Sequence, residues 1–233
     1  MTIFDLLIPR QTCPLCLTLT DNNLCSSCLE QLPFNHYSCP SCALPLNSLL
    51  IDLDQLCGEC LTQPPAFQAS ISPFIYQTPV KQWLRRFKYQ GNLADGERLV
   101  KQLIIAAHNS RHAKPDFLIP VPMHWRKRMV RGFNQTDWLA RRLSSSLNVP
   151  ILNALTRNAG HAPQSHSNRS QRQSLHGVYQ LKSGAIDKIK DKRIALIDDV
   201  VTTGATSRAI SKILSAAKTK RVEIWSLART AKY

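Results

Sequence analysis

Buried strands and amphipathic helices alternate along residues 66–233 of this 233-residue chain. The clearest strand lies at 194–197, where apolar residues follow one another without polar alternation, as is typical of a strand covered on both faces in a parallel sheet. Weaker strand patterns occur at 66–76, 116–121 and 220–227. Apolar residues at helical spacing predict helices at 79–89, 93–112, 136–147 and 207–217. We therefore expect an α/β fold with a mostly parallel sheet and helices on both faces.

Residues 1–65 have a different character, because they hold all eight cysteines and few residues that could form a core. Thiolates at CxxC spacing suit tetrahedral Zn²⁺, and a density of four pairs argues against a thioredoxin-like redox motif. We predict a zinc-ribbon segment at 1–65, with two structural zinc ions, and a second domain at 66–233. The expected ligands are Cys13 and Cys16, Cys25 and Cys28, Cys39 and Cys42, and Cys57 and Cys60.

Two arrangements of the four pairs around two zinc ions are open. In the sequential arrangement, the first two pairs bind one ion and the last two pairs bind the other; a crossed arrangement is the alternative. We favour the sequential arrangement because each half then closes a short loop on its own. Thiolates fill every position of each ion, which is typical of structural zinc.

Charge divides the chain in the same way. Residues 1–65 contain one Arg and six acidic residues, whereas residues 66–233 contain 29 basic and nine acidic residues. The formal net charge of +15 therefore comes from the second part. A surplus of this size favours a polyanionic partner, either nucleic acid or a phosphorylated sugar, although charge alone carries no specificity.

The first residues lack the features of a secretory signal, since Asp5 interrupts a short apolar stretch that ends at Pro9. No apolar run reaches the length of a membrane span. We therefore expect a cytoplasmic protein without membrane insertion.

Polar residues follow the strand at 194–197. Asp198 and Asp199 come first, and a TTGAT turn at 202–206 leads into the predicted helix. Backbone N–H groups at a helix N-terminus bind phosphate well, and Gly204 permits a close approach of the backbone. Two adjacent carboxylates suit sugar hydroxyls or hydrated Mg²⁺. The alternative is an ordinary strand end whose aspartates cap the helix.

The sequence IALIDDVVTTGAT at 194–206 resembles the phosphoribosyl pyrophosphate (PRPP) signature of type I phosphoribosyltransferases. The resemblance implies that Asp198 and Asp199 meet the ribose hydroxyls of Mg²⁺-bound PRPP and that residues 202–206 hold its 5-phosphate. The purine-salvage branch tends to carry a third acid at the position of Thr202, so a base that deprotonates a purine is not expected here. The implied PRPP-binding residues are Asp198, Asp199, Val200, Val201, Thr202, Thr203, Gly204, Ala205 and Thr206.

In the same comparison, a pyrophosphate loop belongs after the strand at 116–121. Four cations occur there, at 126–131. Cations beside a loop whose amides point inward suit a diphosphate leaving group. Further PRPP-binding candidates are Val121, Pro122, Arg126 and Arg128, and the catalytic candidates are Arg131, Asp198 and Asp199.

A second motif, RGFNQ at 131–135, opens the helix predicted at 136–147. Together with the four CxxC pairs, FKY at 87–89, the VVTTGAT turn and the start DLLIPRQTCPLC, it is similar to the ComF family of bacterial competence and DNA-utilisation proteins. The similarity covers nearly the whole chain and is greatest to the GntX-like branch. It implies a zinc-finger segment fused to a phosphoribosyltransferase-type domain, a role in handling incoming single-stranded DNA, and a helicase or translocase partner.

Basic and aromatic residues of the second domain are candidates for nucleic-acid contact. Trp83, Tyr89, Trp125 and Trp138 either stack on bases or belong to the core. Residues 157–176 are too polar for a core, and they form either a loop that covers the site or a plain surface loop. The basic candidates are Arg85, Arg86, Lys88, Arg126, Lys127, Arg131, Arg169 and Arg172.

Functions of different classes fit these features. The first is a phosphoribosyltransferase-like enzyme that binds PRPP or a ribose 5-phosphate group and acts in the uptake or use of single-stranded DNA, with no acceptor-binding segment legible in the sequence. The second is a non-catalytic single-stranded-DNA-binding competence factor that holds nucleic acid in the same pocket. A PRPP-sensing regulator without turnover is a third.

Overall fold

The computed structural model describes residues 11–46, 55–158 and 177–232. By its internal contacts the chain separates into two compact units, residues 1–33 and 34–233. The second half of the Cys-rich segment therefore groups with the sheet. The boundary that we expect between residues 65 and 66 separates regions of different composition, and it stays a prediction.

The first unit is a small ribbon around four cysteines. β1 (Gln11–Thr12) pairs antiparallel with β2 (Leu19–Thr20), and α1 (Ser26–Glu30) follows. Cys13 holds the turn between the strands: its N–H donates to the carbonyl of Thr18 at 2.8 Å, and its carbonyl accepts from Leu17 N–H at 2.9 Å. Most side chains of this unit are exposed, so metal ligands rather than an apolar core are available to stabilise it.

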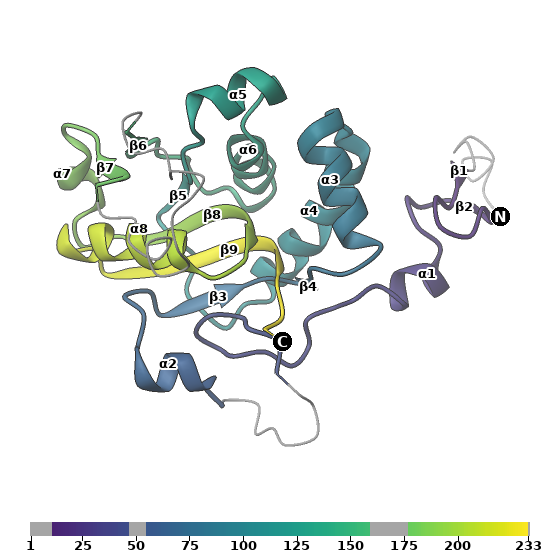
Figure 1. The fold of residues 1–233 in the computed structure, drawn as a ribbon, viewed down its shortest axis with the longest axis horizontal. Coiled ribbons are helices and arrows are strands. Elements are labelled where there is room, and N and C mark those ends of the chain that lie inside the picture. Colours follow the sequence, from purple (N-terminus) through teal and green to yellow (C-terminus); the bar gives the residue numbers. More distant parts are fainter. Residues whose placement is uncertain (1–10, 47–54, 159–176, 233) are drawn as a thin grey trace, which may run out of the picture. The chain divides into compact units, whose positions relative to one another are not determined.

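A five-stranded sheet, parallel in its described pairs, forms the centre of the second unit (Figure 1). The strands at 116–121, 194–197 and 220–227 are confirmed, and the strand pattern at 66–76 resolves into two short strands. The strand predicted at 194–197 extends to Val201, beyond its apolar residues, because it pairs with the strand at 221–229 from Arg193 to Val201. The order is β3 (Ala69–Ile71), β9 (Arg221–Arg229), β8 (Arg193–Val201) and β5 (Phe117–Pro120), and β4 (Phe74–Ile75) also pairs with β9.

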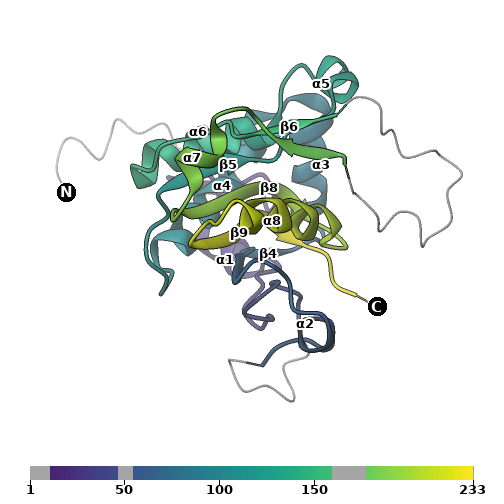
Figure 2. The ribbon, with the colours of Figure 1, turned by 90° about the vertical axis from the view of Figure 1, so that its left-hand side faces the viewer.

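Helices cover both faces of this sheet. α4 (Leu93–His108) and α6 (Gln135–Leu147) pack on one face, and α8 (Ala205–Ala216) packs on the other (Figures 1 and 2). α3 (Val80–Gln90) packs on α4, and the four predicted helices are thus confirmed. The two helices approach closely at Gly96, where an added Cβ would lie 2.7 Å from the Phe87 ring.

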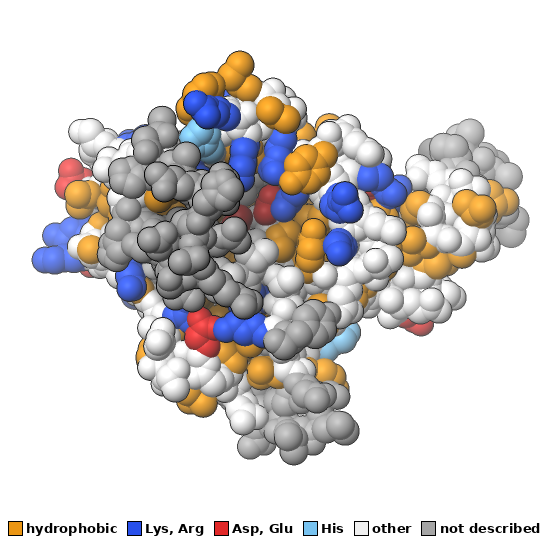
Figure 3. All heavy atoms as spheres, viewed as in Figure 1, with side chains coloured by type: hydrophobic (Ala, Val, Ile, Leu, Met, Phe, Trp, Pro, Cys, Tyr) orange, Lys and Arg blue, Asp and Glu red, His pale blue; other side chains and the backbone are white. Residues whose placement is uncertain are grey.

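One segment differs from the prediction. The cations at 126–131, expected beside a pyrophosphate loop, lie on a helix, α5 (Trp125–Arg131). The His124 side chain accepts from Arg126 N–H at 3.2 Å at the start of the helix, and Gly132, with φ of 75°, ends it. The segment buries no residue, so local capping rather than apolar periodicity defines this helix. Lys and Arg side chains gather over α3 and α5 on the face shown in Figure 3.

Four short elements complete the second unit. α2 (Gly58–Thr62) begins directly after Cys57 and contains Cys60. β6 (Leu155–Arg157) pairs antiparallel with β7 (Tyr179–Leu181), and α7 (Ala185–Ile189) follows β7. Of the polar segment at 157–176, expected as a loop that covers the site or as a plain surface loop, Arg157 belongs to β6, and residues 159–176 lie outside the described residues. Across the parts of the chain that are described, every helix is too short or too polar to cross a bilayer.

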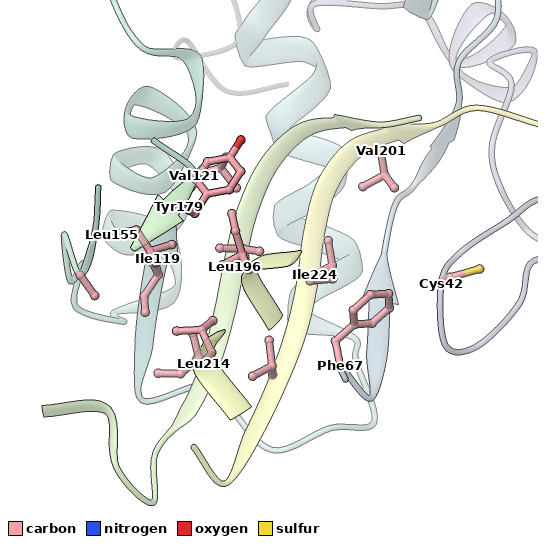
Figure 4. Close-up of a cluster of buried hydrophobic side chains, with 14 of the residues drawn as sticks. Cys42, Phe67, Ile119, Val121, Leu155, Tyr179, Leu196, Val201, Leu214 and Ile224 are labelled. Carbon is pink, nitrogen blue, oxygen red and sulfur yellow. The ribbon is translucent and has the colours of Figure 1, made fainter. Parts of the chain in front are cut away.

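The core on the α8 side explains why the cysteines at 39, 42, 57 and 60, the second Cys group, belong to this unit. Leu214 of α8 packs there with Leu196 of β8 and Ile224 of β9 (Figure 4). Phe67 and Cys42 extend the same buried cluster, which also contains the other three thiols of the group. Neighbours along a strand point to opposite faces, so the alternate residues of β8 and β9 pack toward α4 and α6.

Candidate functional site

The two carboxylates lie at the carboxyl end of the central part of the sheet. Asp198 and Asp199 are the sixth and seventh residues of β8, and β5 ends beside them. Val121 N–H donates to the carbonyl of Ile197 at 3.0 Å, so the Val121–Pro122 peptide follows directly alongside the carboxylates. Because β5 and β8 are parallel, the fold brings the two predicted segments to one edge, where open α/β sheets bind ligands.

The carboxylates point to opposite faces of the sheet and meet different groups. Asp199 forms an ion pair with Lys88 of α3, with 2.9 Å between Oδ1 and Nζ, and both side chains are 16% exposed. Its N–H donates to Asp198 Oδ1 at 2.8 Å. Burial, and then the neighbouring Asp199 carboxylate, raise the pKa of Asp198 from 3.8 to about 7. Asp198 therefore gains or loses its proton near neutral pH.

The turn after β8 has the form of an anion site. Val200 and Val201 still belong to β8, the turn follows at 202–204, and α8 begins at Ala205. Gly204 has φ of 76°, a conformation that favours glycine, and no atom lies within 4 Å of the position of an added Cβ. Thr203 Oγ1 accepts from Ala205 N–H at 3.3 Å, and Thr202 and Thr203 are exposed. Hydroxyl groups and helix N–H groups are thus exposed together, as phosphate binding requires.

The RGFNQ motif joins the loop after β5 to α3. Gln135 Oε1 accepts from Arg131 at 3.2 Å, and its Nε2 donates to the carbonyl of Lys88 at 3.4 Å. The Phe133 and Phe87 rings lie 5.5 Å apart. The motif therefore contacts both Phe87 and Lys88 of the FKY segment, and it positions the residue that pairs with Asp199.

Asn134 and Thr136 support the same loop from α6. Asn134 caps this helix, and its side chain accepts from Thr136 N–H at 3.4 Å. The Thr136 hydroxyl donates to the carbonyl of Val121 at 2.7 Å. The Asn side chain and the hydroxyl are buried, so the main chain beside the carboxylates is held by side chains of α6.

Two exposed aromatic residues near the site each lie under a guanidinium group. Arg126 lies over Trp125 at 5.3 Å, and Arg131 lies over Tyr89 at 4.7 Å. Trp125 is 51% exposed and Tyr89 is 64% exposed. The Arg131 guanidinium also donates to the Tyr89 hydroxyl at 3.1 Å, which connects α5 to α3. Aromatic faces and cations in this arrangement suit base stacking and phosphate contact.

The other candidates for nucleic-acid contact differ in exposure and in the contacts that their side chains already make. Arg85 and Lys127 are exposed, whereas Arg86 binds the buried carboxylate of Asp95 at 2.6 Å. Trp83 is 2% exposed, so it belongs to the core. Trp138 packs 5.0 Å from Phe87. Two further candidates lie outside the described residues: Arg169 and Arg172.

Cavities lie on two sides of this edge. One, of about 440 Å³, borders the β5 end and has Pro122 and Arg128 in its lining. The other, of about 530 Å³, borders the turn after β8, with Thr203, Arg208 and Tyr179 in its lining. Burial raises the pKa of the Tyr179 hydroxyl. Sequence reasoning missed Tyr179, for which the only local signal is an aromatic residue in a short strand beside a polar loop.

The eight thiols form two groups of four. Each group lies within 4.8 Å from sulfur to sulfur, and thiolates about 2.3 Å from a tetrahedral zinc ion lie close to such a spacing. The residues present therefore fit two structural zinc ions, one in each compact unit. The sequential arrangement predicted from loop closure is confirmed: Cys13, Cys16, Cys25 and Cys28 form the first group, and Cys39, Cys42, Cys57 and Cys60 form the second.

The chain is similar to known proteins. The family described as "Double zinc ribbon domain" matches residues 3–61. "Competence protein F" of Haemophilus influenzae is 31% identical over 91% of this chain and 93% of its own length. This chain belongs to the ComF family. Other members are "DNA utilization protein YhgH" of Escherichia coli K12, 28% identical over 94% of this chain and 95% of its own, and "Competence protein ComFC" of Streptococcus pneumoniae, 27% identical over 90% and 89%.

Solved structures similar to this ComF family member include phosphoribosyltransferases. Adenine phosphoribosyl transferase from Trypanosoma brucei, in complex with AMP, pyrophosphate and ribose-5-phosphate, matches 70% of this chain and 71% of that chain, with 13% identity and a TM-score of 0.43. Glutamine PRPP amidotransferase from B. subtilis matches 62% of this chain and 30% of that chain, with 17% identity and a TM-score of 0.42.

Proposed function

We propose that the edge of the sheet at Asp198 and Asp199 binds PRPP or another ribose 5-phosphate group, and that the protein uses it in the uptake or utilisation of incoming single-stranded DNA. One observation carries the proposal. Two carboxylates end a buried parallel strand, and the same chain segment then supplies exposed hydroxyls and the start of α8. Carboxylates bind sugar hydroxyls or hydrated Mg²⁺, and a helix N-terminus binds phosphate, so the order along the chain matches a sugar phosphate.

In this proposal the 5-phosphate lies against the turn at 202–206 and the diphosphate lies near Val121 and Pro122. Asp198 and Asp199 hold the ribose hydroxyls and stabilise positive charge on the sugar as the anomeric bond breaks. Mg²⁺, when bound with PRPP, neutralises the diphosphate and makes it a better leaving group. Arg131 contacts the diphosphate with its positive charge, and Arg126 and Arg128 of α5 are further contacts.

Lys88 has a distinct part in this scheme. Its ion pair with Asp199 orients one carboxylate before the ligand binds. Gln135 of the RGFNQ motif donates to the carbonyl of Lys88 at 3.4 Å and so helps to hold Lys88 beside Asp199.

The experiment is a calorimetric titration of Mg²⁺-PRPP into the zinc-loaded protein. We expect saturable binding to the wild type and at least about 100-fold weaker binding to Asp198→Asn combined with Asp199→Asn, since each lost charged hydrogen bond contributes about 1.5–3 kcal/mol. Asp187→Asn combined with Asp191→Asn, two exposed acids of the same unit, is the matched control and should bind normally. Unchanged affinity in a folded Asp198/Asp199 double variant would contradict the site. Release of diphosphate on adding an acceptor would identify an enzyme, and binding without release a sensor.

The second candidate function is a non-catalytic module that holds single-stranded DNA. The stacked pairs Arg126–Trp125 and Arg131–Tyr89 favour it, because exposed aromatic faces with adjacent cations suit strand binding without sequence preference. Oligonucleotide binding in the absence of any PRPP binding would select this function over the first.

A further inference from the structure

Arg229, at the end of β9, is a buried cation without a carboxylate partner among the described residues. The residue is only 2% exposed. Nε donates to the carbonyl of Cys42 at 3.2 Å, and Nη1 donates to the carbonyls of Val201 at 3.0 Å, Thr202 and Thr230 at 3.3 Å. A buried charge is expensive unless it is fully hydrogen-bonded, so these carbonyls must stay in place for the guanidinium to remain buried.

The carbonyls belong to two parts of the molecule that the sequence keeps far apart. Cys42 belongs to the second group of thiols, whereas Val201 ends β8 and Thr202 begins the turn that follows it. Thr230 reinforces the contact, because its N–H and its hydroxyl donate to the carbonyl of Val201 at 3.0 Å and 3.1 Å. One guanidinium therefore joins the second metal site to the start of the anion-binding turn.

A second connection runs from the same metal site to α8. Arg208, in the first turns of α8, forms an ion pair with Glu59 of α2 at 2.9 Å and donates to the carbonyl of Gln63 at 2.9 Å. Lys232 also pairs with Glu59. α2 begins directly after Cys57 and contains Cys60. Both ends of the turn at 202–204 are thus tied to the segment that the second metal ion would order.

We infer that Arg229 is a positioning residue through which metal binding at the second thiol group sets the geometry of the anion-binding turn. The inference rests on the proposed function for the identity of the ligand, but the coupling itself does not depend on it. Coupling free energies are reciprocal. A phosphate ligand on the turn must therefore also raise the affinity of the second thiol group for its metal ion. The first ion, in the other compact unit, serves as an internal reference.

The first test needs no ligand. Amide hydrogen exchange is compared in full-length, zinc-treated protein between the wild type and two pairs of variants. It is followed at Arg208 and Thr230, whose N–H groups donate to the carbonyls of Gly204 at 2.9 Å and Val201 at 3.0 Å. Arg229→Gln is matched by Arg221→Gln, at the other end of β9, and Cys39→Ser is matched by Cys13→Ser, since both cysteines are 0% exposed. We expect exchange about tenfold faster in Arg229→Gln and Cys39→Ser, and unchanged exchange in both controls.

Metal content distinguishes positioning from general damage. Arg229→Gln should retain two zinc ions and still show the faster amide exchange. If Cys39→Ser does not fold, the result for Arg229→Gln alone tests the inference. A folded Arg229→Gln variant with wild-type exchange at Arg208 and Thr230 would overturn the inference. So would Cys13→Ser having the same effect on the turn as Cys39→Ser.

The second test uses the reciprocal effect. Zinc release to a chelator is followed with and without ribose 5-phosphate; we expect the ligand to slow the release of one of the two ions by about tenfold in the wild type and not in Arg229→Gln. Equal protection in wild type and Arg229→Gln contradicts the coupling. If neither PRPP nor ribose 5-phosphate binds the wild type, the proposed function fails, and the exchange experiment alone decides the role of Arg229.

Discussion

At the scale of single residues, the proton on Asp198 makes stability depend on pH. Its pKa is about 7 in the folded protein, against 3.8 ordinarily, because of burial and the Asp199 carboxylate. The folded state holds this proton more tightly than the unfolded state does. Its contribution to stability is therefore complete below about pH 4 and is lost as the pH rises to 7.

Asp198→Asn keeps the shape of the side chain without the charge. We expect the variant to be more stable than wild type at pH 8 by up to about 4 kcal/mol, since each pKa unit is worth about 1.4 kcal/mol, and by about half as much at pH 5.5. Urea unfolding of both proteins at the two pH values measures this. Asp187→Asn, an exposed control, should show no such change, and a pH-independent difference for Asp198→Asn would contradict the assignment.

At the scale of elements, the packing of α3 on α4 sets the position of Lys88. Gly96 of α4 lies against Phe87, whose ring atoms would be 2.7 and 2.8 Å from an added Cβ, and Trp138 would be 3.1 Å away. Ala has the higher helix propensity, worth up to about 1 kcal/mol, but overpacking against rigid rings costs about 1–3 kcal/mol. The clash should therefore exceed the gain in propensity.

We expect Gly96→Ala to lower the free energy of unfolding by about 1–2 kcal/mol and to weaken PRPP binding, because α3 carries the partner of Asp199. Chemical denaturation and calorimetry measure the two effects. Phe87→Leu removes ring atoms from the contact, so in that background Gly96→Ala should cost less. Additive effects of the two substitutions would mean that the ring is not the cause.

At the scale of the whole molecule, the surplus of positive charge predicts salt-dependent binding of single-stranded DNA. Each phosphate contact contributes about 0.7 to the slope of log affinity against log salt. Arg126→Gln with Lys127→Gln should therefore lower the slope by about 1.4, whereas Trp125→Ala should weaken binding by about 1–3 kcal/mol at every salt concentration. Fluorescence anisotropy with a labelled oligonucleotide at several salt concentrations separates the two effects. Lys188→Gln with Lys190→Gln, on and after α7, is the charge-matched control, and an equal loss of slope there would mean that the binding face lies elsewhere.

The contiguous features of this protein were legible in the sequence because their physical causes are local. CxxC spacing places two thiolates on one ion, and the short loops between pairs favour the sequential grouping that the structure has. An apolar run followed by Asp198, Asp199 and a Thr/Gly turn describes a strand end and a helix start, and parallel pairing with β5 then brings Val121 beside them. α5 escaped prediction because its helix depends on caps rather than on a buried face.

The contacts that join these features were decided only by the tertiary structure. Lys88 meets Asp199, and Arg229 meets the carbonyls of Cys42 and Val201, across long separations in the chain. Such contacts depend on the order of strands, on which face of β8 each carboxylate takes, and on which helix covers that face. The local pattern of polar and apolar residues does not contain this information. The sequence around a buried cation such as Arg229 is the same whichever distant carbonyls accept its hydrogen bonds.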